Sequence, residues 1–245
     1  MSLALGEALE AMAGFPEIAP TDFVRRGLLV IAPHPDDESL GCGGLIAACR
    51  AAGLPVSILI VSDGAGSHPG SALFPPAILA ALRQEEAIMA AAVLGVGASH
   101  VHFAGLPDRS VPMSGYEAER ACERIAALAA AADVVAVTWR HDPHGDHKAS
   151  FALARAAVGR VPGAGLWEYP IWGLTLPPKM ALPGERPRGV RVHVADHLPA
   201  KRRAIAAHAS QTTALIVDDP KGFRLTPEML ARFDTEWETF IECPL

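Results

Sequence analysis

The chain has 245 residues, a formal net charge of −6 with histidine neutral, and hydrophobic side chains at 50% of its positions. This length and composition fit one α/β domain with a large core, and they argue against a disordered chain. The longest basic cluster is only Lys201-Arg202-Arg203. The sequence therefore predicts neither nucleic acid nor an anionic membrane surface as a partner.

Several features predict a soluble, cytoplasmic protein. The first twenty residues contain three glutamates and no basic residue, unlike a secretory signal peptide. No apolar run reaches the roughly 18 residues that a membrane span needs. The cysteines form no CxxC pair, which is typical of free thiols in a reducing compartment; they are Cys42, Cys49, Cys122 and Cys243. A homo-oligomer is left open.

The predicted elements begin with a short amphipathic helix at residues 4–13. Residues 28–32, LLVIA, form an uninterrupted apolar run, which is typical of a strand covered on both faces in a parallel sheet. An alanine-rich helical pattern follows from about residue 45 and ends at Gly53. The turn between this strand and this helix carries the first chemical motif.

This turn contains one histidine and three adjacent carboxylates: His34, Asp36, Asp37 and Glu38. Helix capping is one interpretation, since a carboxylate gains about 0.3–1 kcal/mol at a helix N-terminus. However, the three anions repel each other, and the helix dipole supplies only about half a positive charge. A bound divalent cation would neutralise the remainder. The motif therefore favours a metal site over capping alone.

Further apolar runs alternate with helical patterns along the rest of the chain. Such alternation indicates a doubly wound, mostly parallel sheet with helices on both faces. The remaining predicted strands are residues 56–61, 101–103, 134–139 and 190–194, and the predicted helices are residues 76–94, 117–131, 148–158 and one starting near 201.

A second chemical motif follows the strand at 134–139. Residues 140–147, RHDPHGDH, contain three histidines and two aspartates. In a parallel sheet with right-handed crossovers, the carboxyl ends of the strands lie at one edge, where ligands bind. We therefore expect the two motifs to meet in space.

The combined motifs contain the side chains of a catalytic zinc site, which has three protein ligands and one open position for water. His34, one of Asp36 and Asp37, and one histidine of the second motif would supply the ligands. Water bound to such an ion has a pKa near about 7. A remaining carboxylate would take its proton, and a remaining histidine would stabilise the oxyanion and protonate the leaving group. The sequence thus predicts hydrolysis of an amide or ester.

These residues carry a resemblance to a known family. Residues 33–38 (PHPDDE), 41–44 (GCGG) and 144–147 (HGDH) resemble the PIG-L/LmbE-like N-acetylglucosaminyl deacetylase family. Two weaker features are similar to its R-x-x-E helix and its late K-x-x-A…H-x-S-Q pattern, at residues 83–86 and 201–211. The resemblance implies a Rossmann-like fold, and it covers about residues 28–211.

The resemblance also implies roles for individual residues. It makes His34, Asp37 and His147 the ligands of one Zn²⁺ per chain, with another divalent metal as the alternative. It makes Asp36 the general base. It places His144 against the oxyanion or leaving group, with Asp146 as its partner, and it assigns Arg83 to the substrate.

Two departures from the family pattern affect this assignment. Gly145 stands where the family usually has proline, which loosens the turn but keeps the spacing. Some members place a tyrosine ahead of this motif as general acid, whereas here the only tyrosines are Tyr116 and Tyr169. His144 is therefore our first choice for protonating the leaving amine.

Other residues near the motifs have two interpretations each. His141 and Asp142 either support the metal ligands or shape the loop. His68 is more typical of an exposed loop histidine than of a substrate contact, and His208 fits helix packing. An aromatic group either provides a wall for a sugar ring or belongs to the core; its members are Trp167, Tyr169 and Trp172. A proline-rich loop at residues 176–187 is a candidate for the pocket rim.

Taken together, the sequence predicts a single domain, residues 1–245, with a core at about 26–211 and a C-terminal extension at 212–245. The leading functional hypothesis is a zinc-dependent deacetylase of a small N-acetylated amino sugar or sugar conjugate. The alternatives are a metal-dependent amidase acting on a non-sugar or thiol-conjugate amide and, less favoured, a Rossmann-type nucleotide-binding module. The nucleotide module is disfavoured because the G-x-G-x-x-G order is missing and three carboxylates would repel a pyrophosphate.

Overall fold

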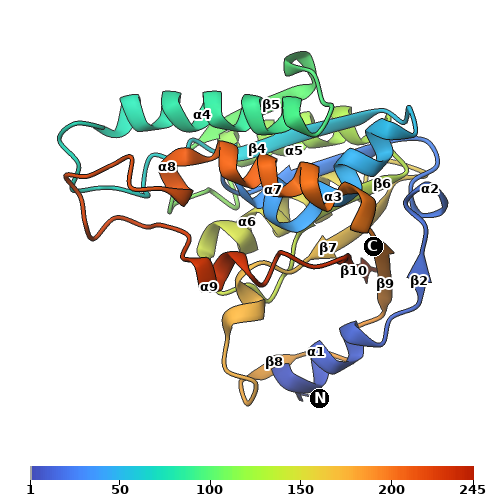
Figure 1. The fold of residues 1–245 in the computed structure, drawn as a ribbon. Coiled ribbons are helices and arrows are strands. Elements are labelled where there is room, and N and C mark those ends of the chain that lie inside the picture. Colours follow the sequence, from blue (N-terminus) through green and yellow to red (C-terminus); the bar gives the residue numbers. More distant parts are fainter. Residues whose placement is uncertain (1) are drawn as a thin grey trace.

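The computed structural model describes residues 2–245 and is organised around an eight-stranded sheet (Figure 1). The strand order is β2-β9-β10-β7-β6-β3-β4-β5. The core strands β7, β6, β3, β4 and β5 are parallel, whereas β10 runs antiparallel to both of its neighbours. Their bounds are β2 (Glu17–Ile18), β3 (Leu28–Ala32), β4 (Val56–Ser62), β5 (Val101–Leu106), β6 (Val134–Thr138), β7 (Gly165–Tyr169), β9 (Gly189–His193) and β10 (Trp237–Cys243).

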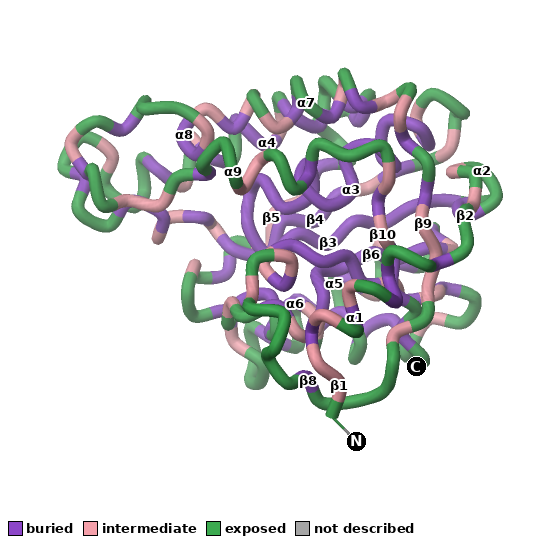
Figure 2. Tube along the Cα trace, turned by 60° about the horizontal axis from the view of Figure 1, so that its bottom comes forward, coloured by how far each residue is buried: buried purple, intermediate pink, exposed green. Residues whose placement is uncertain are grey.

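The central strands are buried on both faces because nearly all of their residues are apolar (Figure 2). Side chains alternate between the two faces of a strand. In β3, Leu28 and Val30 accordingly join one hydrophobic core, whereas Leu29 and Ile31 join the other. The predicted doubly wound α/β sheet is confirmed.

Helices cover both faces of this sheet. One core contains side chains of α3 (Asp37–Ala51), α4 (Pro76–Val93) and α7 (Leu198–Ala207). The other contains side chains of α5 (Tyr116–Ala129) and α6 (Gly145–Val158). The shorter helical elements are α2 (Pro20–Phe23), α8 (Ala209–Thr212), α9 (Pro227–Leu230), η1 (Ala98–His100), η2 (Trp172–Thr175) and η3 (Ala195–His197).

Both ends of the described chain contribute to the fold. Helix α1 (Leu5–Ala13) packs in a small third cluster, and β1 (Ser2–Ala4) pairs with β8 (Ala181–Pro183). This pairing holds the proline-rich loop beside the N-terminus. Strand β10 lies within the segment that the sequence assigns to a C-terminal extension, yet it is inserted in the sheet between β7 and β9.

Two helices begin earlier than their sequence patterns indicate. The pattern places the helix start near residue 45 in one motif and at 148 in the other, but α3 begins at Asp37 and α6 at Gly145. The first turns of both helices are therefore built from the motif residues themselves. Their polar side chains obscure the apolar periodicity on which the sequence prediction depends.

In residues 2–245, none of the helices combines the length and apolar character that crossing a membrane requires.

Gly41 sits where α3 meets Tyr169, and we predict that Gly41→Ala destabilises the protein. An added Cβ would lie 2.2 Å from Tyr169 Cδ2. The ring has no room to retreat, because Tyr169 is fully buried and its hydroxyl donates to the Ile31 carbonyl at 2.8 Å. Such overpacking costs about 1–3 kcal/mol.

Thermal unfolding should show this cost as a fall in Tm of about 2–4 °C per kcal/mol. Gly97→Ala is the matched control, since no atom lies within 4 Å of a Cβ added at Gly97. Equal Tm values for the two variants would contradict the packing described for Gly41.

Candidate metal centre and active site

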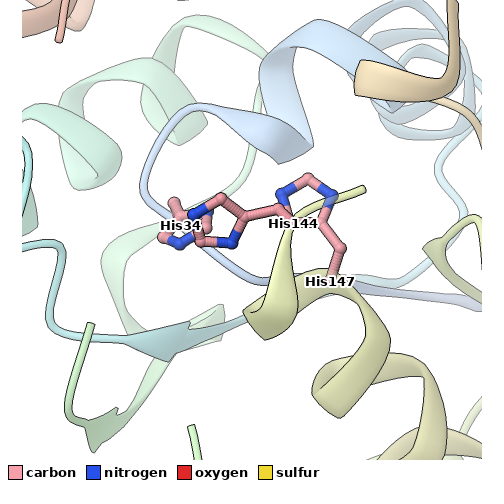
Figure 3. A group of neighbouring side chains, drawn as sticks. All are labelled: His34, His144 and His147. Carbon is pink, nitrogen blue, oxygen red and sulfur yellow. The ribbon is translucent and has the colours of Figure 1, made fainter. Parts of the chain in front are cut away.

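The carboxyl ends of β3 and β6 bring the two sequence motifs together. The strands are neighbours in the sheet, and each is followed directly by one motif. Figure 3 shows the resulting group of His34, His144 and His147. The ring centroid of His34 lies 4.7 Å from that of His144 and 5.3 Å from that of His147. The expected convergence of the motifs is therefore present.

One carboxylate oxygen joins two of these imidazoles. Asp37 Oδ2 lies 3.3 Å from His34 Nδ1 and 3.3 Å from His147 Nε2. Ligands about 2.0–2.2 Å from a tetrahedral ion stand about 3.3–3.6 Å apart, so this spacing fits a shared ion. His147 Nε2 is also buried without a hydrogen-bond partner among the described residues. The His/Asp/His cluster therefore fits a divalent metal.

Two other groupings of ligand atoms occur at the same place. The nitrogens of His34, His144 and His147 lie within 4.8 Å of one another, which makes His144 an alternative third ligand. One ligand atom from each of His34, Asp108 and Asp146 likewise lies within 4.8 Å of the other two. In this second group His34 Nε2 is 3.2 Å from Asp108 Oδ1 and 3.1 Å from Asp146 Oδ2. These carboxylates can orient His34 through Nε2 while Nδ1 faces Asp37.

Asp142 orients the other histidine. Its Oδ2 lies 2.9 Å from His147 Nδ1, which leaves Nε2 directed at Asp37. Asp142 is itself fixed by backbone N–H groups that donate to its carboxylate, those of Ile171, Trp172 and Gly173. The sequence leaves open whether Asp142 supports a metal ligand or shapes the loop. The structure favours support of a candidate ligand, His147. His141 instead packs on Trp139 and faces another cavity.

Asp146 is attached mainly to His34 and to a loop. Its carboxylate accepts the backbone N–H groups of Arg109 at 2.6 Å and Val111 at 3.1 Å, besides its contact with His34. Its link to His144 is a backbone hydrogen bond, in which the Asp146 N–H donates to His144 Nδ1 at 3.2 Å. The side chains of Asp146 and His144 approach only to 4.0 Å.

The electrostatics of the cluster favour the charged forms. Burial opposes ionisation of Asp37, but the imidazoles of His147 and His34 outweigh it and hold the pKa of this carboxyl well below its usual range. Burial likewise opposes protonation of His147, but Asp37 and Asp142 outweigh it and raise the pKa to about 9. Metal binding replaces protons on such ligands, so the cluster is suited to a cation.

Asp36 lies beside the cluster in a strained backbone conformation, with φ at 147°. Burial, opposed by Arg83, raises the pKa of its carboxyl to about 6. Arg83, predicted to contact substrate, is itself buried and donates to Asp36 Oδ2 at 3.2 Å, to the Pro35 carbonyl at 2.8 Å and to the Gly64 carbonyl at 2.9 Å. Arg83 therefore fixes the first motif, and it also lines the cavity.

A cavity of about 410 Å³ opens over these residues. Trp172 and Phe223 form part of its wall, with their ring centroids 5.7 Å apart. Of the three aromatic residues that the sequence singles out, only Trp172 lines the cavity; Trp167 packs on Phe23, and Tyr169 is buried in the core. The proline-rich loop does not line it either, so its expected place on the rim is wrong.

Three residues of the site region have roles that the sequence did not indicate. Asp108 contacts His34, and Glu38 forms a buried contact with His208. Asp108 could have been found, because it lies two residues after the end of β5 and so at the same edge of the sheet as both motifs. The contact between Glu38 and His208 spans distant parts of the chain, and a single sequence carries no signal for it.

The fold and the site define a class. An α/β sheet that carries a His/Asp/His cluster, a spare carboxylate and a spare histidine at the ends of its parallel strands has the groups that a metal-dependent hydrolase uses. Residues 29–158 match the PIG-L family, described as GlcNAc-PI de-N-acetylase. The chain belongs to this family.

Individual relatives agree with this placement. The chain is 26% identical to a probable N-acetyl-alpha-D-glucosaminyl L-malate deacetylase 2 of Bacillus cereus, over 80% of this chain and 88% of that protein. It is 28% identical to a 1D-myo-inositol 2-acetamido-2-deoxy-alpha-D-glucopyranoside deacetylase of Actinosynnema mirum, over 76% and 81%. The fold resembles that of the N,N'-diacetylchitobiose deacetylase from Pyrococcus horikoshii, with a TM-score of 0.65, 23% identity, and coverage of 92% and 86%.

We predict that Asp142→Asn weakens metal binding about 10- to 100-fold, as loss of a partner that orients a ligand typically does. The asparagine side chain has one NH₂ group in place of a carboxylate oxygen. This NH₂ group would face either His147 Nδ1 or the backbone N–H groups that donate to the Asp142 carboxylate. Titration with Zn²⁺ measures the affinity. His141→Gln is the matched control and should bind as the unsubstituted protein does; equal affinity of both variants would remove Asp142 from the metal centre.

Proposed function

We propose that this protein is a zinc-dependent N-deacetylase that acts on a small N-acetylglucosaminyl conjugate. His34, Asp37 and His147 hold one Zn²⁺ per chain. The observation that carries the proposal is the single oxygen, Asp37 Oδ2, at 3.3 Å from a nitrogen of each histidine. A bound ion of this kind acts as a Lewis acid toward the amide carbonyl and lowers the pKa of water to about 7.

Asp36 is the proposed general base. Its Oδ2 accepts a hydrogen bond from Arg83, whereas Oδ1 has no hydrogen-bond partner in residues 2–245. Oδ1 is therefore the atom that accepts a proton from the attacking water. The same carboxyl then carries this proton to the leaving amine, so that one side chain serves as base and acid in turn.

His144 is the proposed donor to the oxyanion. Because its Nδ1 accepts the backbone N–H of Asp146, the proton of the neutral ring resides on Nε2. The imidazole is half-buried at the cavity wall, where Nε2–H can donate to the developing negative charge. This arrangement supports the oxyanion role of His144 and shifts protonation of the amine to Asp36.

The substrate class is supported by the family and by the two relatives, whose names specify N-acetylglucosaminyl malate and N-acetylglucosaminyl inositol compounds. A cavity of about 410 Å³ lies within the range that holds a small ligand. Trp172 and Phe223 offer the flat apolar surface on which a sugar ring packs. An amide without a sugar would leave this wall without its expected contact.

The test of this function is acetate release from a panel of N-acetylated compounds by the zinc-loaded protein. We expect release from N-acetylglucosaminyl conjugates and no release from N-acetylated amino acids or thiol conjugates that lack a sugar. Turnover of only the sugar-free amides would establish the amidase alternative instead. A chelator should abolish the activity and Zn²⁺ should restore it.

We predict that Asp36→Asn retains stoichiometric Zn²⁺ but loses nearly all hydrolysis, because an amide cannot accept the proton of water. Loss of general-base catalysis of this kind typically costs about 10²–10⁴-fold in rate. Zinc content by metal analysis and kcat on the best substrate of the panel are the measurements. Full activity in the variant would exclude Asp36 as the base.

A further inference from the structure

Glu38 and His208 form a buried polar pair beside Asp36, and the proposed reaction uses neither. Glu38 is fully buried and His208 is 1% exposed. His208 Nε2 lies 2.9 Å from Glu38 Oε1, and because a carboxylate only accepts, the imidazole is the donor. Glu38 Oε2 accepts the backbone N–H of Asp36 at 3.0 Å. Hydrogen bonds thus run from the junction of α7 and α8 to the backbone of the proposed base.

A second connection reaches Asp36 from α4. Arg83 donates to the carboxylate of Asp36, and Glu86, one helical turn further on, accepts both the N–H and the hydroxyl of Ser210. Ser210 follows His208 by two residues on the same segment. Glu38 therefore holds the backbone of Asp36, and Arg83 holds its side chain. The segment from His208 to Ser210 connects the two, because it contacts Glu38 on one side and Glu86 of α4 on the other.

The backbone of Asp36 needs such support. A φ of 147° is rare for a residue with a side chain, and sparsely populated conformations of this kind cost about 1–3 kcal/mol. They persist only where the surrounding structure fixes them. The hydrogen bond from Asp36 N–H to Glu38 acts directly on the strained residue.

We infer that Glu38 and His208 are positioning residues that hold the Asp36 carboxylate in its reactive place. This inference rests on the proposed role of Asp36 as base. His208 fixes Glu38, Glu38 fixes the backbone of Asp36, and Arg83 fixes the carboxylate oxygen that does not take the proton. Neither Glu38 nor His208 lines the cavity, so neither is placed to contact a substrate bound there.

Packing of α7 on α3 has a separate polar connection, which provides a matched control. Lys201 Nζ on α7 donates to Glu238 at 2.7 Å, and the backbone N–H groups of Gly44 and Leu45 on α3 donate to the same carboxylate at 2.8 Å. Lys201 and Glu238 are buried, as Glu38 and His208 are, but none of these hydrogen bonds involves Asp36. Glu238→Gln therefore disturbs the same pair of helices without reaching the proposed base.

The experiment compares Glu38→Gln, His208→Leu, His208→Gln and Glu238→Gln in the zinc-loaded protein. We expect Glu38→Gln and His208→Leu to lower kcat by up to about 100-fold, the effect of a displacement near 1 Å, with unchanged KM and zinc content. His208→Gln retains an N–H donor and should recover most of the loss. Glu238→Gln should lower Tm to a similar extent and leave kcat unchanged.

A crystal structure of His208→Leu provides a readout that does not depend on activity, and we expect Asp36 to leave its φ of 147° there. If kcat falls no further than in Glu238→Gln, if zinc is lost, or if Asp36 is unmoved in that crystal structure, the inference is wrong. If the unsubstituted protein releases no acetate from any compound, the proposed function fails, and the position of Asp36 in the variant still decides the inference.

Discussion

The site depends on one buried carboxylate shared by two imidazoles. Removing a carboxylate from water costs several kcal/mol, so Asp37, which is 1% exposed, requires positive charge at its oxygens. His34 and His147 face it from the ends of two different strands. Further buried or partly buried carboxylates surround the pair, those of Asp36, Asp108 and Asp146, whereas within residues 2–245 Arg83 is the one arginine whose guanidinium forms an ion pair with any of them. This excess of negative charge explains why the site suits a divalent cation.

The architecture holds these groups at short distances without long connections. β3 and β6 lie side by side in the centre of the sheet, apolar on both faces, and each leads into a helix whose first turn carries the motif. The fixed strands leave the turns little freedom, so a strained residue such as Asp36 can be maintained. Residues that follow β5 and β7, and the segment around α8, then complete the surroundings, through Asp108, the N–H groups that hold Asp142, and His208.

Strong local patterns predicted much of this arrangement. The apolar runs at residues 28–32, 56–61 and 134–139 correspond to β3, β4 and β6, and the alternation of strands and helices is enough to place both motifs at one edge. Strand β10 was missed because its seven residues, WETFIEC, form neither a continuous apolar run nor a strict alternation of apolar and polar side chains, and because buried Glu238 stands at a position where a core strand would carry an apolar residue. Antiparallel insertion between β7 and β9 depends on pairing with distant strands, which local propensity does not encode.

The sequence by itself determined the chemistry: which strands end in histidines and carboxylates, that these ends share one edge, and that a spare acid and a spare imidazole remain. Only the tertiary structure decided the partners, namely that Asp142 serves His147, that Asp146 and Asp108 serve His34, and that Glu38 reaches His208. The physical reason is the range of the interactions. Apolar periodicity and motif spacing are properties of neighbouring residues, whereas a hydrogen bond between side chains many residues apart depends on angstrom-scale placement that packing of the whole chain sets.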